Sequence, residues 1–154
     1  MDSIFKKEFE ILSLGNQKNT SLESILQKNS KVLLYFYPKD NTPGCSLENK
    51  DFSCLKDEFE KIGIKLIGVS KDSIDSHKKF VSNYNLENDL ISDENLELHK
   101  YFKAYGEKNN YGKLILGVIR SSFLIDNNFN ILKSWKNIKA KNHAQKVLDE
   151  LKSN

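Results

Sequence analysis

The chain has 154 residues, and its 24 Lys and Arg against 21 Asp and Glu give a formal charge of +3. A single domain of this size buries roughly 68–70% of its unfolded surface, so the fold requires neither disulfides nor a structural metal. Two cysteines are in any case too few for a disulfide scaffold. Basic and acidic residues are interleaved along the whole length, so we expect a solvated surface and no nucleic-acid partner.

Sequence signals of membrane insertion and secretion are missing. No apolar run approaches the roughly 20 residues that span a bilayer, and residues 1–10 lack the apolar segment of a secretory signal. We therefore expect a cytoplasmic protein without a membrane partner, built as one domain over residues 1–154.

The first half of the chain predicts a βαβ unit. After a predicted strand at 9–12 and a short helix at 22–27, residues 31–37 form a continuous apolar and aromatic run that Pro38 ends. A second buried strand is predicted at 64–70. Between the two strands, residues 43–62 are predicted as one helix, with Pro in its first turn and Gly just after its end. A strand, a helix and a strand in this order form parallel strands.

The inner face of that helix follows from the helical period. On a wheel of about 100° per residue, the apolar side chains gather in one arc, which we expect to face the core. The arc contains Cys45, Leu47, Phe52, Leu55, Phe59 and Ile62.

The second half continues the α/β pattern. We predict a helix at 73–84, a short strand at 89–92, a helix at 95–105, a polar link at 106–113, strands at 115–126 and 130–135, and a final helix at 142–151. Asn127 and Asn128 suit a tight turn between the last two strands. The whole pattern predicts one α/β domain with a mixed sheet.

Arginine usage is uneven. Of the 24 basic residues, 23 are Lys and only Arg120 is Arg. A coding bias toward Lys would leave Arg only where a planar, permanently charged fork is needed, which makes Arg120 a candidate functional residue. Chance retention on the surface is the alternative.

Cys45 occupies the position where chemistry is expected in such a sheet. Active sites lie at the carboxyl ends of parallel strands, and Cys45 comes shortly after the first buried strand, in the first turn of the following helix. There the helix dipole and free backbone N–H groups stabilise a thiolate. Thr42 lies at or near the N-cap and is placed to donate its hydroxyl hydrogen to the sulfur or to a bound oxygen. Without further residues, Cys45 is equally well a small hydrophobe.

The residues around Cys45 resemble a known family. The segment 35–48, with its Pro-x-x-x-Thr-x-x-Cys pattern and an Arg 75 residues downstream, is similar to the signature of the peroxiredoxins. The subfamily it resembles is that of bacterioferritin comigratory protein, also called peroxiredoxin Q. The resemblance continues in order through residues 68–70, 90–93, 120–126 and 142–148, and so covers nearly the whole chain.

This resemblance implies a fold and an activity. The fold is the thioredoxin-like peroxiredoxin fold, a central mixed β-sheet flanked by helices. The activity is reduction of hydrogen peroxide and organic hydroperoxides through a sulfenic acid on Cys45, regenerated by thioredoxin or another small thiol reductant, with no cofactor. We expect a monomer, with a weak dimer as the alternative. A peroxide-sensing or redox-binding module on the same fold, without efficient turnover, is the alternative function.

The resemblance also implies roles around the nucleophile. Arg120 would hold the thiolate and the peroxide, and Thr42 with the backbone N–H groups near Gly44 would supply further donors. Pro38 would screen the sulfur from bulk water. Glu48 matches an acidic position of the subfamily, where it would pair with Arg120; a solvated helix carboxylate is its alternative.

The second cysteine departs from the subfamily's commonest pattern. Many members carry a resolving cysteine five residues after the peroxidatic one, where this chain has Lys50. Cys54 lies nine residues after Cys45, roughly 13 Å along an intact helix, whereas a disulfide needs Cα atoms within about 7 Å. Either the helix unwinds and Cys54 attacks the sulfenic acid, or an external thiol resolves it.

The three histidines predict no metal site. His77, His99 and His143 are far apart in the sequence, and the cysteines lack Cys-x-x-Cys spacing. We expect His77 to be solvated on a polar helix and His143 to have a capping or packing role. Trp135 is expected in the core.

Overall fold

The computed structural model describes residues 3–110 and 112–153. Its strands are β1 (Glu8–Ser13), β2 (Asn16–Ser21), β3 (Lys31–Phe36), β4 (Ile64–Ser70), β5 (Asp89–Ser92), β6 (Tyr105–Asn110), β7 (Lys113–Val118), β8 (Ser121–Asp126) and β9 (Ile131–Trp135). Its helices are α1 (Leu22–Lys28), α2 (Pro43–Cys54), α3 (Lys56–Lys61), α4 (Ile74–Tyr84), α5 (Glu97–Tyr101) and α6 (His143–Lys152), after a 3₁₀ turn at Ser3–Phe5.

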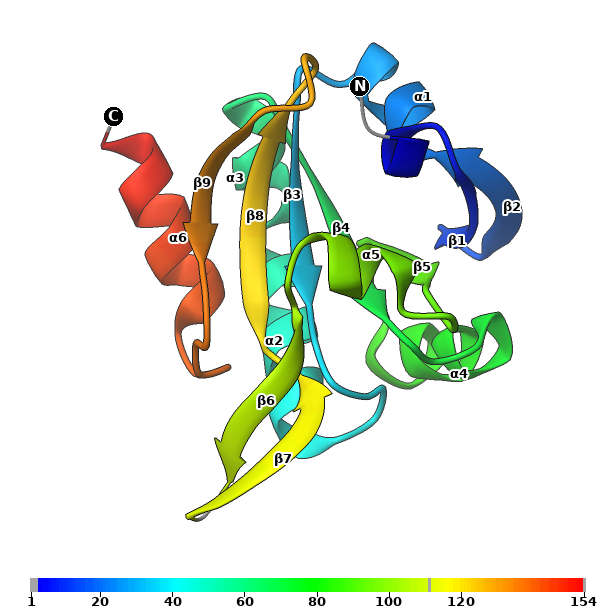
Figure 1. The fold of residues 1–154 in the computed structure, drawn as a ribbon. Coiled ribbons are helices and arrows are strands. Elements are labelled where there is room, and N and C mark those ends of the chain that lie inside the picture. Colours follow the sequence, from blue (N-terminus) through cyan, green and yellow to red (C-terminus); the bar gives the residue numbers. More distant parts are fainter. Residues whose placement is uncertain (1–2, 111, 154) are drawn as a thin grey trace.

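Seven strands of the described chain form one mixed sheet in the order β2-β1-β5-β4-β3-β8-β9 (Figure 1). The central strands β3, β4 and β5 are parallel, while β8 pairs with β3 in the antiparallel sense. The predicted βαβ unit and the predicted mixed sheet are therefore confirmed. None of the helices in residues 3–110 and 112–153 is long and apolar enough to cross a membrane.

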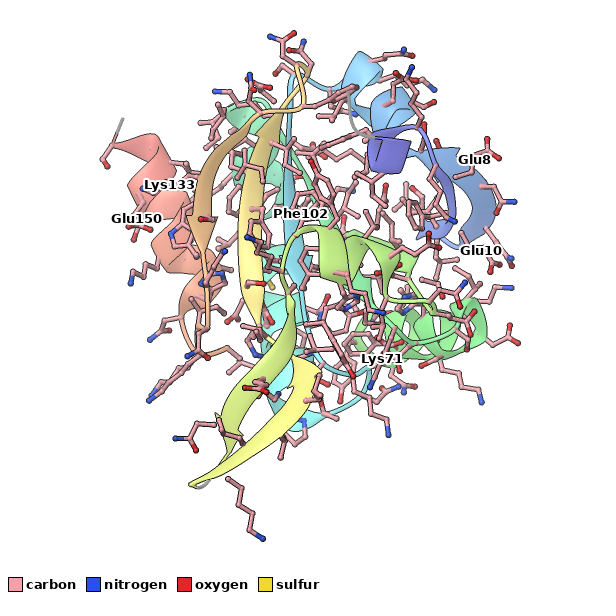
Figure 2. The ribbon with its side chains drawn as sticks, in the orientation of Figure 1. Glu8, Glu10, Lys71, Phe102, Lys133 and Glu150 are labelled. Atoms are coloured by element: carbon pink, nitrogen blue, oxygen red, sulfur yellow. The ribbon has the colours of Figure 1, made fainter. Side chains whose placement is uncertain are left out.

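Two hydrophobic clusters cover the two faces of the sheet. Along β3 the side chains alternate between them, because successive residues of a strand point to opposite faces: Val32 and Leu34 join one cluster, Leu33 and Tyr35 the other. The first cluster packs under α1 and α5 and includes Phe102, which Figure 2 shows in front of the sheet. The second packs under α2, α3, α4 and α6. Both faces are covered, as the apolar sequence of β3 requires.

The predicted helix at 43–62 is two helices. α2 ends at Cys54, and Leu55, with φ −96° and ψ 4°, separates it from α3. The inner face of α2 also differs from the prediction, because Leu47 is 42% exposed whereas Glu48 and Asn49 are fully buried. Ser46 is buried in the first turn, and the other buried positions, 45, 48, 49 and 52, follow the helical period. The periodicity was thus correct, but two polar side chains replace the leucine on the inner face.

Two further expectations are wrong in the same region of the chain. In the predicted polar link at 106–113, residues 106–110 belong to β6 and residue 113 begins β7; these two strands pair in a hairpin that extends from the body of the molecule in Figure 1. The strand predicted at 115–126 is interrupted, and Ile119 instead donates its backbone N–H to the carbonyl of Ala104 at 2.7 Å. This break places Arg120 directly before β8, at the end of the sheet where β3 leads into α2.

Candidate active site

Cys45 lies in the first turn of α2 and is 1% exposed. Thr42 is the N-cap residue and Pro43 begins the helix, where its missing N–H costs nothing. The hydrogen bonds of the helix begin in this turn, where Ser46 donates its backbone N–H to the Thr42 carbonyl at 2.8 Å. The sulfur therefore sits at the positive end of the helix dipole, as expected.

Arg120 contacts Cys45 through its guanidinium. Nη2 donates to Cys45 Sγ at 3.2 Å, and Nη1 donates to Glu48 Oε1. Gly44 lies close to this fork, where a Cβ would be 3.4 Å from Nη2, in van der Waals contact with it. Burial acts to lower the pKa of Arg120, but the neighbouring Glu48 and Cys45 raise it above its ordinary value. Arg120 thus contacts both Cys45 and Glu48, the residues that the resemblance places beside it.

Glu48 is fully buried one turn after Cys45. Burial raises the pKa of its carboxyl to about 7, against the opposing influence of Arg120. Its Oε2 has no hydrogen-bond partner among the described residues, although Oε1 accepts from the guanidinium. The alternative of a solvated carboxylate is excluded, and the expected pairing with Arg120 is present.

The loop between β3 and α2 carries Pro38 and Thr42. Pro38 is half-buried at the end of β3. The Thr42 hydroxyl donates to the carbonyl of Lys39 at 2.9 Å, so its hydrogen is not directed at the sulfur, and its side chain makes no cap bond to the helix.

A buried Asp–His pair holds this loop, and the sequence interpretation missed it. Asp40 accepts from Tyr37 Oη at 2.7 Å, Ser76 Oγ at 2.8 Å and His77 Nδ1 at 2.7 Å. His77 is fully buried and its Nε2 lies 3.0 Å from the carbonyl of Ile91, so its predicted solvation is wrong. The apolar spacing of α4 could have indicated this, because His77 stands three residues from buried side chains on either side, at 74 and 80.

His143 packs behind the site. It is 3% exposed, and its ring lies edge-on to Phe52 and Trp135. Burial lowers its pKa to about 4, and Nε2 lies 2.8 Å from Ser122 Oγ. The expected packing role is confirmed, as is the core position of Trp135. Within residues 3–110 and 112–153, no three His, Cys, Asp or Glu side chains gather to hold a metal.

Cys54 is the last residue of α2 and is exposed. Both cysteines are free thiols, and α2 is continuous between them. Cys54 opens into a shallow cavity of about 260 Å³ that it shares with Asp51, Asn142 and Gln145. It lies outside the cluster around Cys45.

The sequence matches one family model and is similar to bacterial proteins. The model of the AhpC/TSA family matches residues 6–134. A putative peroxiredoxin bcp of Helicobacter pylori strain J99 is 52% identical over 131 residues, which is 85% of this chain and 85% of that protein. Peroxiredoxin Bcp of Xanthomonas campestris is 40% identical over 142 residues, covering 92% of this chain and 88% of that protein.

Solved structures of related proteins are also similar to this one. The bacterioferritin comigratory protein of Xanthomonas campestris, from a study of its alkyl peroxide reduction activity, matches with a TM-score of 0.86 and 38% identity over 98% of this chain and 93% of that one. A mutant of Xylella fastidiosa PrxQ matches with a TM-score of 0.89 and 35% identity over 99% and 92% of the two chains.

Proposed function

The chain belongs to the AhpC/TSA family and is a peroxiredoxin, a thiol-dependent peroxidase, and on this premise we propose that Cys45 is its nucleophile. The observation that carries the proposal is the 3.2 Å contact between Arg120 Nη2 and Cys45 Sγ at a buried helix N-terminus. A permanent cation and the helix dipole together favour the thiolate, which is the reactive form of cysteine.

The Cys45 thiolate attacks the hydroxyl oxygen of the peroxide, and the O–O bond breaks as the S–O bond forms. Cys45 becomes a sulfenic acid, and the leaving oxygen takes a proton and departs as water or an alcohol. Negative charge moves from sulfur to the leaving oxygen, so a donor that reaches both positions lowers the barrier. Arg120 is that donor in our proposal.

The remaining residues support this step. Glu48 orients the guanidinium by accepting from Nη1. Gly44 lies beside the guanidinium, Pro38 screens the sulfur, and Thr42 binds the peroxide with its hydroxyl oxygen while donating to the loop carbonyl. The Thr42 oxygen keeps a lone pair for a peroxide hydrogen, because a hydroxyl has one donor and two acceptor positions.

For the substrate and the reductant we propose hydrogen peroxide and organic hydroperoxides on one side and thioredoxin, or another small thiol, on the other. The similarity to a protein studied for alkyl peroxide reduction supports the first. We also propose that the protein works in the cytoplasm as one domain over residues 1–154 and as a monomer, with a weak dimer as the alternative. The single sheet shared by both core clusters supports the single domain.

The test follows NADPH consumption with thioredoxin and its reductase, using hydrogen peroxide and an organic hydroperoxide in parallel. Wild type and a Cys54→Ser variant are expected to turn over, and Cys45→Ser is expected to be inactive. A peroxide sensor would instead be oxidised without turnover, and a binding module would react no faster than free cysteine. Neither the site nor the relatives favour these alternatives.

A further inference from the structure

Three polar side chains form a buried cluster beneath the first two turns of α2. Tyr35 on β3 donates its hydroxyl to Asn49 Oδ1 at 2.7 Å, and Asn88 Nδ2 donates to the same Tyr35 oxygen. Asn49 Nδ2 in turn donates to the carbonyl of Cys45 at 2.9 Å. Tyr35 and Asn49 are fully buried and Asn88 is 2% exposed. We call these three residues the α2 clamp.

The strand side of the clamp is rigid. Tyr35 belongs to the central strand of the sheet, and its ring stacks on Phe52 with centroids 4.3 Å apart. On the neighbouring strand, Gly68 lets the ring lie directly against the backbone, since a Cβ there would be 2.7 Å from Tyr35 Cζ. Burial raises the pKa of Tyr35 well above its ordinary value, so the hydroxyl stays a neutral donor. The Tyr35 oxygen is thus a fixed anchor for Asn49.

The helix side of the clamp lies between the two cysteines. In the intact α2, Cys45 and Cys54 are separated by nine residues, or about 13 Å along the axis. A disulfide needs Cα atoms within about 7 Å. The residues between them would therefore have to leave the helix, and both Asn49 and Phe52 are among them. That movement would strip the acceptor Asn49 Oδ1 from the Tyr35 hydroxyl inside the core, which is costly.

We propose that the α2 clamp keeps α2 folded after oxidation, so that Cys54 does not resolve Cys45 and the thiol of a separate molecule does. That thiol attacks the sulfenic sulfur, forming a mixed disulfide and releasing water. A second thiol of the reductant then attacks this mixed disulfide. Cys45 is released as a thiol, and the two reductant thiols leave as a disulfide. Two electrons pass from the two thiols to the peroxide through Cys45, and Cys54 stays a thiol throughout. This inference rests on the proposed role of Cys45.

The experiment compares oxidation products of the whole protein. Wild type, Asn49→Ala and Lys50→Ala are each treated with one equivalent of hydrogen peroxide in the absence of reductant, then blocked with a thiol reagent and weighed intact. Wild type is expected to gain one oxygen atom and keep one blockable thiol. Asn49→Ala is expected to lose two hydrogen atoms and keep no blockable thiol in its oxidised fraction, with at least tenfold more internal disulfide than wild type.

Lys50→Ala is the matched control. Lys50 is exposed on α2 beside Asn49, and alanine raises helix propensity at either position. Propensity alone would therefore stabilise the helix in both variants and suppress the disulfide. Only loss of the clamp predicts opposite results for the neighbouring substitutions, and the tenfold difference corresponds to about 1.4 kcal/mol. Tyr35→Phe, which keeps the ring and removes the hydroxyl, is expected to act like Asn49→Ala and covers the case in which Asn49→Ala fails to fold.

The outcomes separate the clamp from the proposed function. If wild type forms the internal disulfide as readily as the clamp variants, the inference is wrong, while Cys45 keeps its role. If Asn49→Ala and Tyr35→Phe both retain the sulfenic acid as wild type does, the clamp is not what blocks Cys54, and the inference is again overturned. If Cys45 is not oxidised in any of the proteins, the proposed nucleophile fails and the inference fails with it.

Discussion

Replacing Arg120 with Lys tests the central contact of the site. The guanidinium contacts two groups at once, Glu48 through Nη1 and Cys45 Sγ through Nη2 at 3.2 Å. An ammonium is a point charge and cannot reproduce this fork. Because Glu48 is fully buried, the ammonium is expected to remain with the carboxylate. The sulfur and the peroxide then lose their shared donor, although the net charge of the protein is unchanged.

The size of the effect follows from the role of one positioned donor. Removing a single donor to developing charge costs about 10²–10³ in rate, or about 2.7–4 kcal/mol of transition-state stabilisation. We therefore expect Arg120→Lys to lower the rate constant for peroxide by about 100-fold. Since Glu48 keeps a cation beside it, the free energy of unfolding is expected to fall by only about 1.5–3 kcal/mol, as for one altered hydrogen bond to a charged group.

The assay measures oxidation of the reduced enzyme by hydrogen peroxide in rapid mixing, with Trp135 fluorescence as the signal. Lys61→Arg makes the reverse exchange at an exposed position on α3 and is expected to retain the wild-type rate. Urea unfolding of each variant separates a catalytic loss from a folding defect. A near-wild-type rate for Arg120→Lys would refute the argument that the planar fork is required, even though the family assignment would stand.

Three further predictions concern stability. Burial raises the pKa of Glu48 to about 7, so the contribution of Glu48 to stability falls as pH rises from about 4.5 to 7. Burial lowers the pKa of His143 to about 4, so the contribution of His143 to stability rises between about pH 4 and 6.5. In urea unfolding across this range, Glu48→Gln should therefore remove the contribution that falls with pH and make the slope of stability against pH more positive than in wild type; a wild-type slope in the variant would contradict this. Asp40→Ala should cost about 1–3 kcal/mol by leaving the buried His77 Nδ1 without its hydrogen-bond partner, while Asp40→Asn, which retains hydrogen bonding, should cost less. Gly68→Ala should cost about 1–3 kcal/mol in the same measurement, because its Cβ would meet a ring carbon at 2.7 Å, and an unchanged midpoint would show that the ring can move.

Much of the fold could be predicted because its signals are local. The apolar run ending at Pro38, the helix start at Pro43 and the break at Gly63 each depend on a few adjacent residues. These signals placed β3, β4 and the start of α2 within a few residues of their observed positions, although the helix predicted at 43–62 is divided at Leu55. The same holds for Cys45, since its position in the first turn of a helix follows from the strand and the proline before it.

Burial of polar residues could not be predicted in this way. Whether Glu48 or Asn49 faces the core depends on partners that are distant in the sequence, namely Arg120 and the tyrosine of β3. His77 is buried for the same reason, because Asp40 comes 37 residues earlier. A helical period shows which residues share a face, but a polar side chain can face the core only where the fold brings a partner to it.

The sequence by itself determined the βαβ unit and the mixed sheet, and its resemblance to the peroxiredoxins indicated the chemistry proposed for Cys45 and its downstream arginine. Only the tertiary structure decided the geometry of the site. The strand predicted at 115–126 is interrupted before β8, and this interruption lets Arg120 reach Cys45 Sγ. The α2 clamp beneath α2 likewise depends on residues from separate segments. The physical reason is that local patterns set the backbone conformation of each segment, whereas the packing of distant segments sets which polar atoms meet in the core.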